Sequence, residues 1–105
     1  MKSLIAAAIC ALSVLSGTEA IAQYIPPKGF VPDRITAIAI ARAVLTPIYG
    51  LEQIRSEEPL VAKEMPDRWL VTGTLTCGGR VCLGGTAEIE IAKSDGRVLR
   101  VIHGQ

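Results

Sequence analysis

The spacing of the apolar residues changes at Pro59, and this change determines which folds the chain can adopt. Before Pro59, apolar residues recur between residues 37 and 48 at intervals of three and four. This is the period of a helix with one buried face. After Pro59, apolar and polar residues alternate, which is the period of a strand with one face in the core. The sequence therefore predicts helix first and sheet afterwards, which is typical of an α+β domain.

The helix is expected to begin after Asp33, whose side chain can cap the first turn. We expect Pro47 to limit it, because proline lacks a backbone N–H and disfavours helix at the residue before it. A second, short helix is predicted for residues 51–57, after Gly50. Residues 23–32 contain three prolines and predict an extended arm in front of the helix.

Four strands are predicted after Pro59, at residues 60–64, 68–76, 86–92 and 98–103. Asp95-Gly96 is typical of the tight turn between the last two strands. The inward-facing residues are expected to be Trp69, Val71, Gly73, Leu75, Ala87, Ile89, Ile91 and Leu99 or Val101. The predicted fold is thus an N-terminal helix, with a short second helix, packed on a four-stranded antiparallel meander.

Residues 1–22 have the pattern of a secretory signal peptide. Lys2 precedes an apolar run from Leu4 to Leu15, interrupted only by Ser13. Twelve residues are too few to span a bilayer as a helix, which needs roughly 20. Small residues before Gln23 predict cleavage between Ala22 and Gln23, export to the periplasm, and a single mature domain from residue 33 to residue 105.

The charge of the chain gives no reason to expect a nucleic-acid or membrane partner. Its formal net charge is +1, and loss of residues 1–22 removes one lysine and one glutamate, so the balance is unchanged. Tight binding to a phosphate backbone or an anionic membrane surface needs an excess of basic residues. We therefore expect no nucleic-acid partner, and no membrane contact after cleavage of the signal.

Cys77 and Cys82 remain after the signal peptide, which contains Cys10, is removed. Disulfides persist in exported proteins, and an even number of cysteines is consistent with pairing. The sequence therefore predicts a Cys77–Cys82 disulfide that closes a short loop, with Arg80 at its tip. A chain of this size is marginal on its core alone, so a cross-link would add stability.

The sequence shows no catalytic or metal-binding pattern. His103 is the chain's one histidine, and with two cysteines it lacks the paired spacing of a structural zinc site. Glu88 and Glu90 lie on one face of a predicted strand, without the unlike environments that acid–base catalysis needs. We therefore predict that the protein is not an enzyme and has no cofactor.

Three blocks of sequence carry a family resemblance. Residues 31–50 (VPDRITAIAIARAVLTPIYG), 69–75 (WLVTGTL) and 84–105 (GGTAEIEIAKSDGRVLRVIHGQ) resemble the NTF2-fold immunity proteins of bacterial polymorphic toxin systems. The resemblance implies a protein that binds and neutralises a cognate toxin. The mature chain is short for the full NTF2-like cone, so a reduced NTF2-like or cystatin-like two-layer domain is expected. The cysteine pair is not part of the family pattern.

Two other functions remain open. The Asp-Gly-x-Val-Leu segment at residues 95–99 also resembles exported PepSY-like domains, which implies a modulator of a peptidase, although residues 46–50 and 103–105 favour the immunity family. A small-molecule-binding NTF2-like module is the third reading, and it requires a cavity.

The remaining candidates are binding residues. The candidate partner-binding residues are Tyr49, as an aromatic interface anchor, Arg80, at the loop tip, and Arg97, Arg100 and His103, which lie on or beside the last hairpin. Trp69 is expected to pack in the core. The sequence leaves the oligomeric state and the identity of the toxin open.

Overall fold

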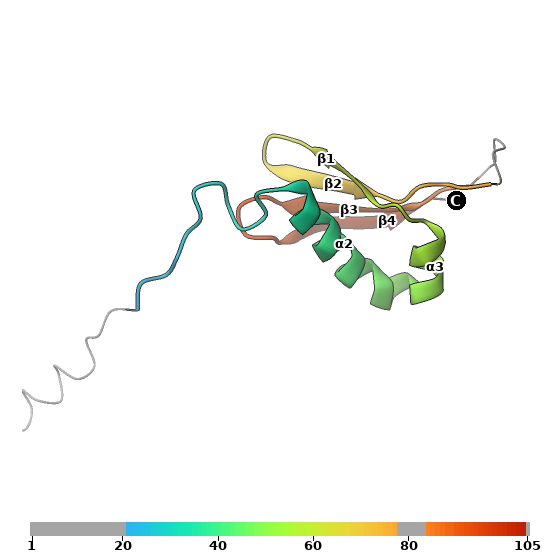
Figure 1. Ribbon diagram of the computed structural model, residues 1–105, viewed down its shortest axis with the longest axis horizontal. Coiled ribbons are helices and arrows are strands. Elements are labelled where there is room, and N and C mark those ends of the chain that lie inside the picture. Colours follow the sequence, from blue (N-terminus) through green and yellow to red (C-terminus); the bar gives the residue numbers. More distant parts are fainter. Residues whose placement is uncertain (1–20, 78–83, 105) are drawn as a thin grey trace, which may run out of the picture.

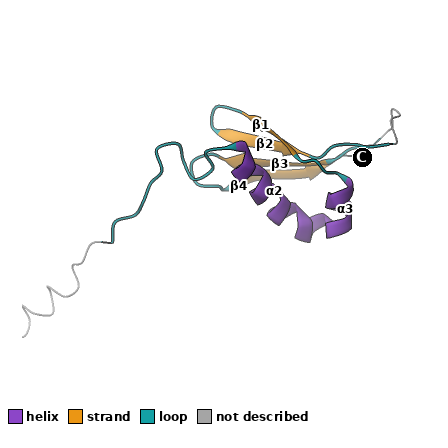
Figure 2. Ribbon diagram, in the orientation of Figure 1, coloured by secondary structure: helices purple, strands orange, loops and turns teal. Residues whose placement is uncertain are grey.

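The computed structural model describes residues 21–77 and 84–104, and places two helices against one antiparallel sheet (Figure 1). The elements are α2 (Arg34–Tyr49), α3 (Leu51–Ser56), β1 (Val61–Glu64), β2 (Arg68–Thr72), β3 (Ala87–Ala92) and β4 (Val98–His103). Each strand pairs with the next along the chain, in the order β1-β2-β3-β4. The helices lie on the same side of the sheet (Figure 2). The α+β architecture predicted from the sequence is confirmed.

The core lies between α2 and the inner face of the sheet. Ala37, Ala41 and Leu45 form the buried stripe of α2, with an exposure of 0% at each position. Val71, Ile89 and Ile91 face this stripe from β2 and β3 and are equally buried. The predicted period-2 alternation of β3 is confirmed, since Ala87, Ile89 and Ile91 are buried while the glutamates between them are partly exposed.

Asp33 caps α2 as predicted, and its side chain accepts a hydrogen bond from the Thr36 N–H at 2.8 Å. The expected effect of Pro47 is wrong, because α2 continues through it to Tyr49. Pro47 lies in the last turn, where its missing N–H removes a single helical hydrogen bond. The helix ends at Gly50, whose N–H donates to the Thr46 carbonyl at 2.8 Å and whose φ is +97°.

The second predicted strand is also shorter than expected, since β2 ends at Thr72 rather than at residue 76. Beyond Gly73 the chain turns toward the segment that follows α3. Thr74 donates from its N–H to the Glu57 carbonyl and from its hydroxyl to the Pro59 carbonyl, each at 2.7 Å. The alternation therefore stops, and Leu75, predicted to face inward, is 44% exposed.

The arm in front of α2 is held to the sheet by backbone contacts and one indole. Phe30 and Val31 donate from their N–H groups to the Ser94 and Lys93 carbonyls at 3.0 and 3.1 Å. The Trp69 indole donates to the Val31 carbonyl at 2.9 Å, and both side chains are buried. Trp69 thus packs in the core as expected. Among the described residues, neither α2 nor α3 has the length and apolar composition of a membrane span.

Candidate functional site

A buried carboxylate, that of Glu57, joins the end of α3 to the ends of β3 and β4. Glu57 directly follows α3 and is 3% exposed. Its carboxylate accepts hydrogen bonds from the Gln53 amide at 2.7 Å, the Ala87 N–H at 2.7 Å and the His103 Nε2 at 2.8 Å. Gln53 lies one turn earlier on α3, so a local helical contact and two long-range contacts meet on the same side chain.

His103 lies between two oxygen acceptors. Its Nε2 faces a Glu57 carboxylate oxygen and its Nδ1 faces the Gly104 carbonyl oxygen, each at 2.8 Å. Because both neighbours can only accept, both ring nitrogens donate when the imidazole is protonated. The Glu57 hydrogen bond, followed by that to Gly104, raises the pKa of His103 above its ordinary value of 6.5, although burial opposes the shift. The Tyr49 ring lies 5.0 Å from the imidazole, centroid to centroid.

The same contacts keep Glu57 ionised. Burial raises the pKa of a carboxylate, but the hydrogen bonds from Gln53, Ala87 and His103 outweigh it, so the pKa of Glu57 is lowered from 4.5. Gly73 makes room for this group, since a Cβ there would lie 2.6 Å from the Glu57 Oε1. A carboxylate saturated by three donors and closed to solvent is a structural anchor that fixes β4 against α3.

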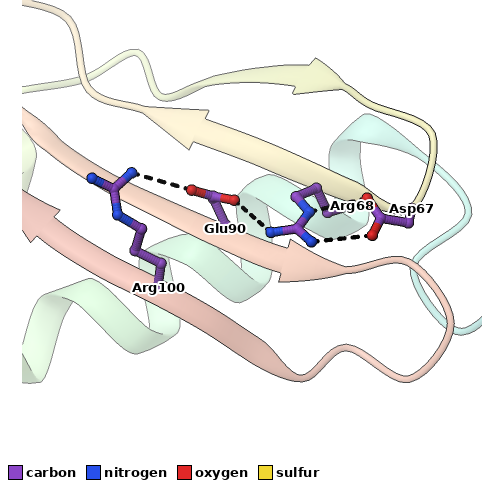
Figure 3. A network of polar contacts seen from close by, with 4 residues as sticks. All are labelled: Asp67, Arg68, Glu90 and Arg100. Atoms are coloured by element: carbon purple, nitrogen blue, oxygen red, sulfur yellow. Dashed lines mark hydrogen bonds and ion pairs between the residues drawn. The ribbon is translucent and has the colours of Figure 1, made fainter.

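A second polar network lies on the opposite, open face of the sheet (Figure 3). Glu90 on β3 accepts from Arg68 on β2 at 2.8 Å and from Arg100 on β4 at 3.2 Å. Arg68 also contacts Asp67 through two nitrogens, at 3.0 and 3.1 Å. Arg68 first, and then Arg100, lowers the pKa of Glu90. Arg100 is thus paired across the strands with Glu90.

The candidate binding residues fall into separate places. Tyr49 and His103 are brought together by the cluster around Glu57. Arg100 belongs to the network on the open face, and Arg97 pairs with Asp95 in the hairpin turn at 2.6 Å. Arg97, Arg100 and His103 lie close together in the sequence, on or beside β4, but the fold does not gather them into one patch.

The remaining predicted residues lie outside the described residues or close to their ends. Arg80 and Cys82 fall outside the described residues, so the Cys77–Cys82 disulfide stays a prediction. Ala22 and Gln23 are exposed in the arm, and most of the predicted signal peptide also lies outside the described residues.

Sequence reasoning missed Glu57. It stands beside Glu58 before a proline, where two adjacent carboxylates look alike. Only the fold separates them, because Glu57 is buried while Glu58 pairs with Arg42 at the surface, at 2.8 Å. The signals available were the four-residue spacing from Gln53 and the presence of a single histidine, and neither determines the contact.

Two open grooves lie at the surface, and the second is lined by residues from the start of α2 and from β1 and β2. One, of about 460 Å³, runs between the arm and two turns of the sheet; the other, of about 430 Å³, lies beside the first turn of α2. Within residues 21–77 and 84–104, no group of three or more histidine, cysteine, aspartate or glutamate side chains is arranged to hold a metal ion.

The helices and the sheet fall within a segment that matches a known family. The family model described as "NTF2 fold immunity protein" matches residues 36–105, which include every strand and nearly all of α2. The chain belongs to this family of NTF2-fold immunity proteins, as the resemblance of its three sequence blocks predicted.

A curated relative is also similar to the chain. It is the protein described as "Uncharacterized protein YhhH" from Escherichia coli (strain K12), which is 31% identical over 78 residues. The matched part covers 74% of this chain and 60% of the relative, so the chain spans less than two thirds of that protein's length. No solved structure matches the chain.

The anchor role of Glu57 predicts that a glutamate-to-glutamine substitution lowers the unfolding free energy more at residue 57 than at residue 58. Glu57→Gln replaces an acceptor of three hydrogen bonds by an amide whose NH₂ group faces donors, so we expect a loss of roughly 1–3 kcal/mol in unfolding free energy. Glu58→Gln weakens a surface pair and should cost roughly 0.2–1 kcal/mol. Urea denaturation of both variants measures the difference, and equal losses would contradict the anchor.

The cluster also predicts a pH dependence. The raised pKa of His103 adds stability that is complete below about pH 6.5 and is lost as pH rises through the higher folded-state value. The lowered pKa of Glu57 adds stability that is lost as pH falls below its ordinary 4.5. Stability should therefore decline on the alkaline side of pH 6.5, and His103→Asn should flatten that limb. An NMR titration of the imidazole with a midpoint below 6.5 would contradict this assignment.

Proposed function

We propose that this protein binds a cognate bacterial toxin in the periplasm and neutralises it by covering the toxin's active site. The observation that carries the proposal is the family match, which spans the helix, the sheet and both polar networks. Membership of an immunity family favours a binding protein over an enzyme. The two grooves described above are open and peripheral, which is consistent with recognition through an outer surface.

The compartment is supported by the sequence. The signal-peptide pattern of residues 1–22 and the pair Cys77 and Cys82 both favour export to an oxidising compartment. A toxin that acts in the periplasm can only be neutralised there, so the leader and the function belong together in this proposal.

Neutralisation is tested with the protein encoded by the neighbouring gene, directed to the periplasm by its own leader. Cells that co-express the full chain should survive, whereas cells that express a chain without residues 1–22 should not. Survival with the leaderless chain would place the interaction in the cytoplasm. If cells with the full chain and cells with the leaderless chain both die, at equal expression, the immunity proposal itself would be overturned.

Export is tested on the protein recovered from the periplasm. Its intact mass should correspond to a chain that begins at Gln23, and it should take up an alkylating reagent only after reduction, because Cys77 and Cys82 are paired. The leaderless chain from the cytoplasm is the control and should react without reduction. Immediate alkylation of both cysteines in the exported protein would contradict the disulfide.

A further inference from the structure

The outer side of β4 is a free edge of the sheet within the described residues. In an antiparallel ladder, the backbone groups of successive residues point alternately to the two sides of a strand. Gly104 donates from its N–H to the Thr86 carbonyl at 3.1 Å, so the even-numbered residues of this strand bond toward β3. The N–H and C=O groups of Val101 and His103 therefore point outward, where another strand can pair with them.

The two edge strands of the sheet differ in how well they are protected against pairing with an added strand. Short length and charged side chains, lysine above all, discourage added strands. β1 has only four residues and carries Lys63 and Glu64. β4 has six residues, and its one arginine, Arg100, is drawn across the open face toward Glu90. The register shift in β4 lies toward Val98, so residues 100–103 pair regularly with β3.

Arg100 and Ile102 flank this edge on the open face. The backbone groups of both residues bond toward β3, so both would occupy non-hydrogen-bonded positions opposite an added antiparallel strand. Facing side chains come closest at such positions. The Arg100 side chain is 55% exposed and contacts Glu90 through one nitrogen, which leaves further N–H donors directed to solvent. Ile102 is 36% exposed beside it.

The charges on β4 disfavour a second copy of the same chain at this edge. The strand reads VLRVIH and contains no carboxylate. Pairing with itself would bring two Arg100 guanidiniums onto adjacent strands, together with two His103 imidazoles. Each imidazole lies between two hydrogen-bond acceptors, which favour its protonated form. Like charges on neighbouring strands are destabilising, whereas a carboxylate would meet the spare donors of Arg100.

We propose that the toxin adds an extended segment to the β4 edge, with a carboxylate opposite Arg100 and an apolar side chain, two residues away, opposite Ile102. The backbone bonds of Val101 and His103 would supply the pairing, and the two side chains the selectivity. This inference rests on the proposed function, and it names the surface that the immunity interaction uses.

Matched substitutions at the two edges test the surface. Val61 on β1 and Ile102 on β4 both lie on the open face of an edge strand, at 51% and 36% exposure. With the neighbouring-gene toxin as the probe, Ile102→Lys should weaken binding about tenfold or more, and Val61→Lys should leave it within about twofold. Arg100→Gln should weaken binding by about fivefold or more. Circular dichroism and thermal unfolding confirm that each variant is folded.

Hydrogen exchange on the wild-type protein gives a readout that needs no variant. Toxin binding should slow exchange of the Val101 and His103 amides at least about tenfold, while the outward amides of β1 stay unchanged. Binding without this protection, protection at β1 instead, or full binding by Ile102→Lys would overturn the edge assignment alone. A concentration-dependent dimer abolished by Ile102→Lys would identify a second copy as the occupant and also overturn it. Absence of any toxin binding by the wild type would overturn the proposed function, and the inference with it.

Discussion

The hydrogen bonds to the Glu57 carboxylate hold together parts of the chain that the apolar core alone would not fix. The core packs α2 on the strands, but α3 is only six residues long and buries a single side chain, Ile54. A helix of this length has little stability of its own. The contacts of Glu57 with Ala87 and His103 tie the end of α3 to β3 and β4. They add to the backbone bonds of Thr74 and Gly104, which hold the end of α3 and the end of β4 from other sides.

The packing of α3 on the sheet thus depends on a buried charge, where a small domain would otherwise need to bury more apolar area. A buried carboxylate is costly unless its partners satisfy it, and here three donors do so, one of which, His103, is a cationic partner when protonated. Gly73 belongs to the same solution, because any larger residue would occupy the space of the carboxylate. The cluster therefore specifies one packing of α3 on the sheet, in which Thr74 also bonds to the Glu57 carbonyl.

Periodicity predicted the fold well, and it could not predict the cluster. The α2 stripe, the alternation in β3 and the cap at Asp33 follow from local spacing and local chemistry, and the structure confirms them. The error at Pro47 arises because a proline in the last turn of a helix costs only one bond. The error after Thr72 arises because tertiary contacts override local preference, since Thr74 finds partners outside the sheet. The Glu57–His103 contact joins residues 46 positions apart, and no spacing rule reports such a pair.

His103 connects the buried cluster to the proposed binding edge. Its side chain points inward to Glu57, while the alternation of the ladder directs its backbone N–H and C=O outward. An edge strand that binds a partner must keep its register when it is unbound, because a flexible strand would lose ordering entropy on binding. The cluster supplies this rigidity from the core side and leaves the outer side of β4 unobstructed. A buried pair with a structural role is thus consistent with a binding protein, since it fixes the geometry of the surface that the partner would meet.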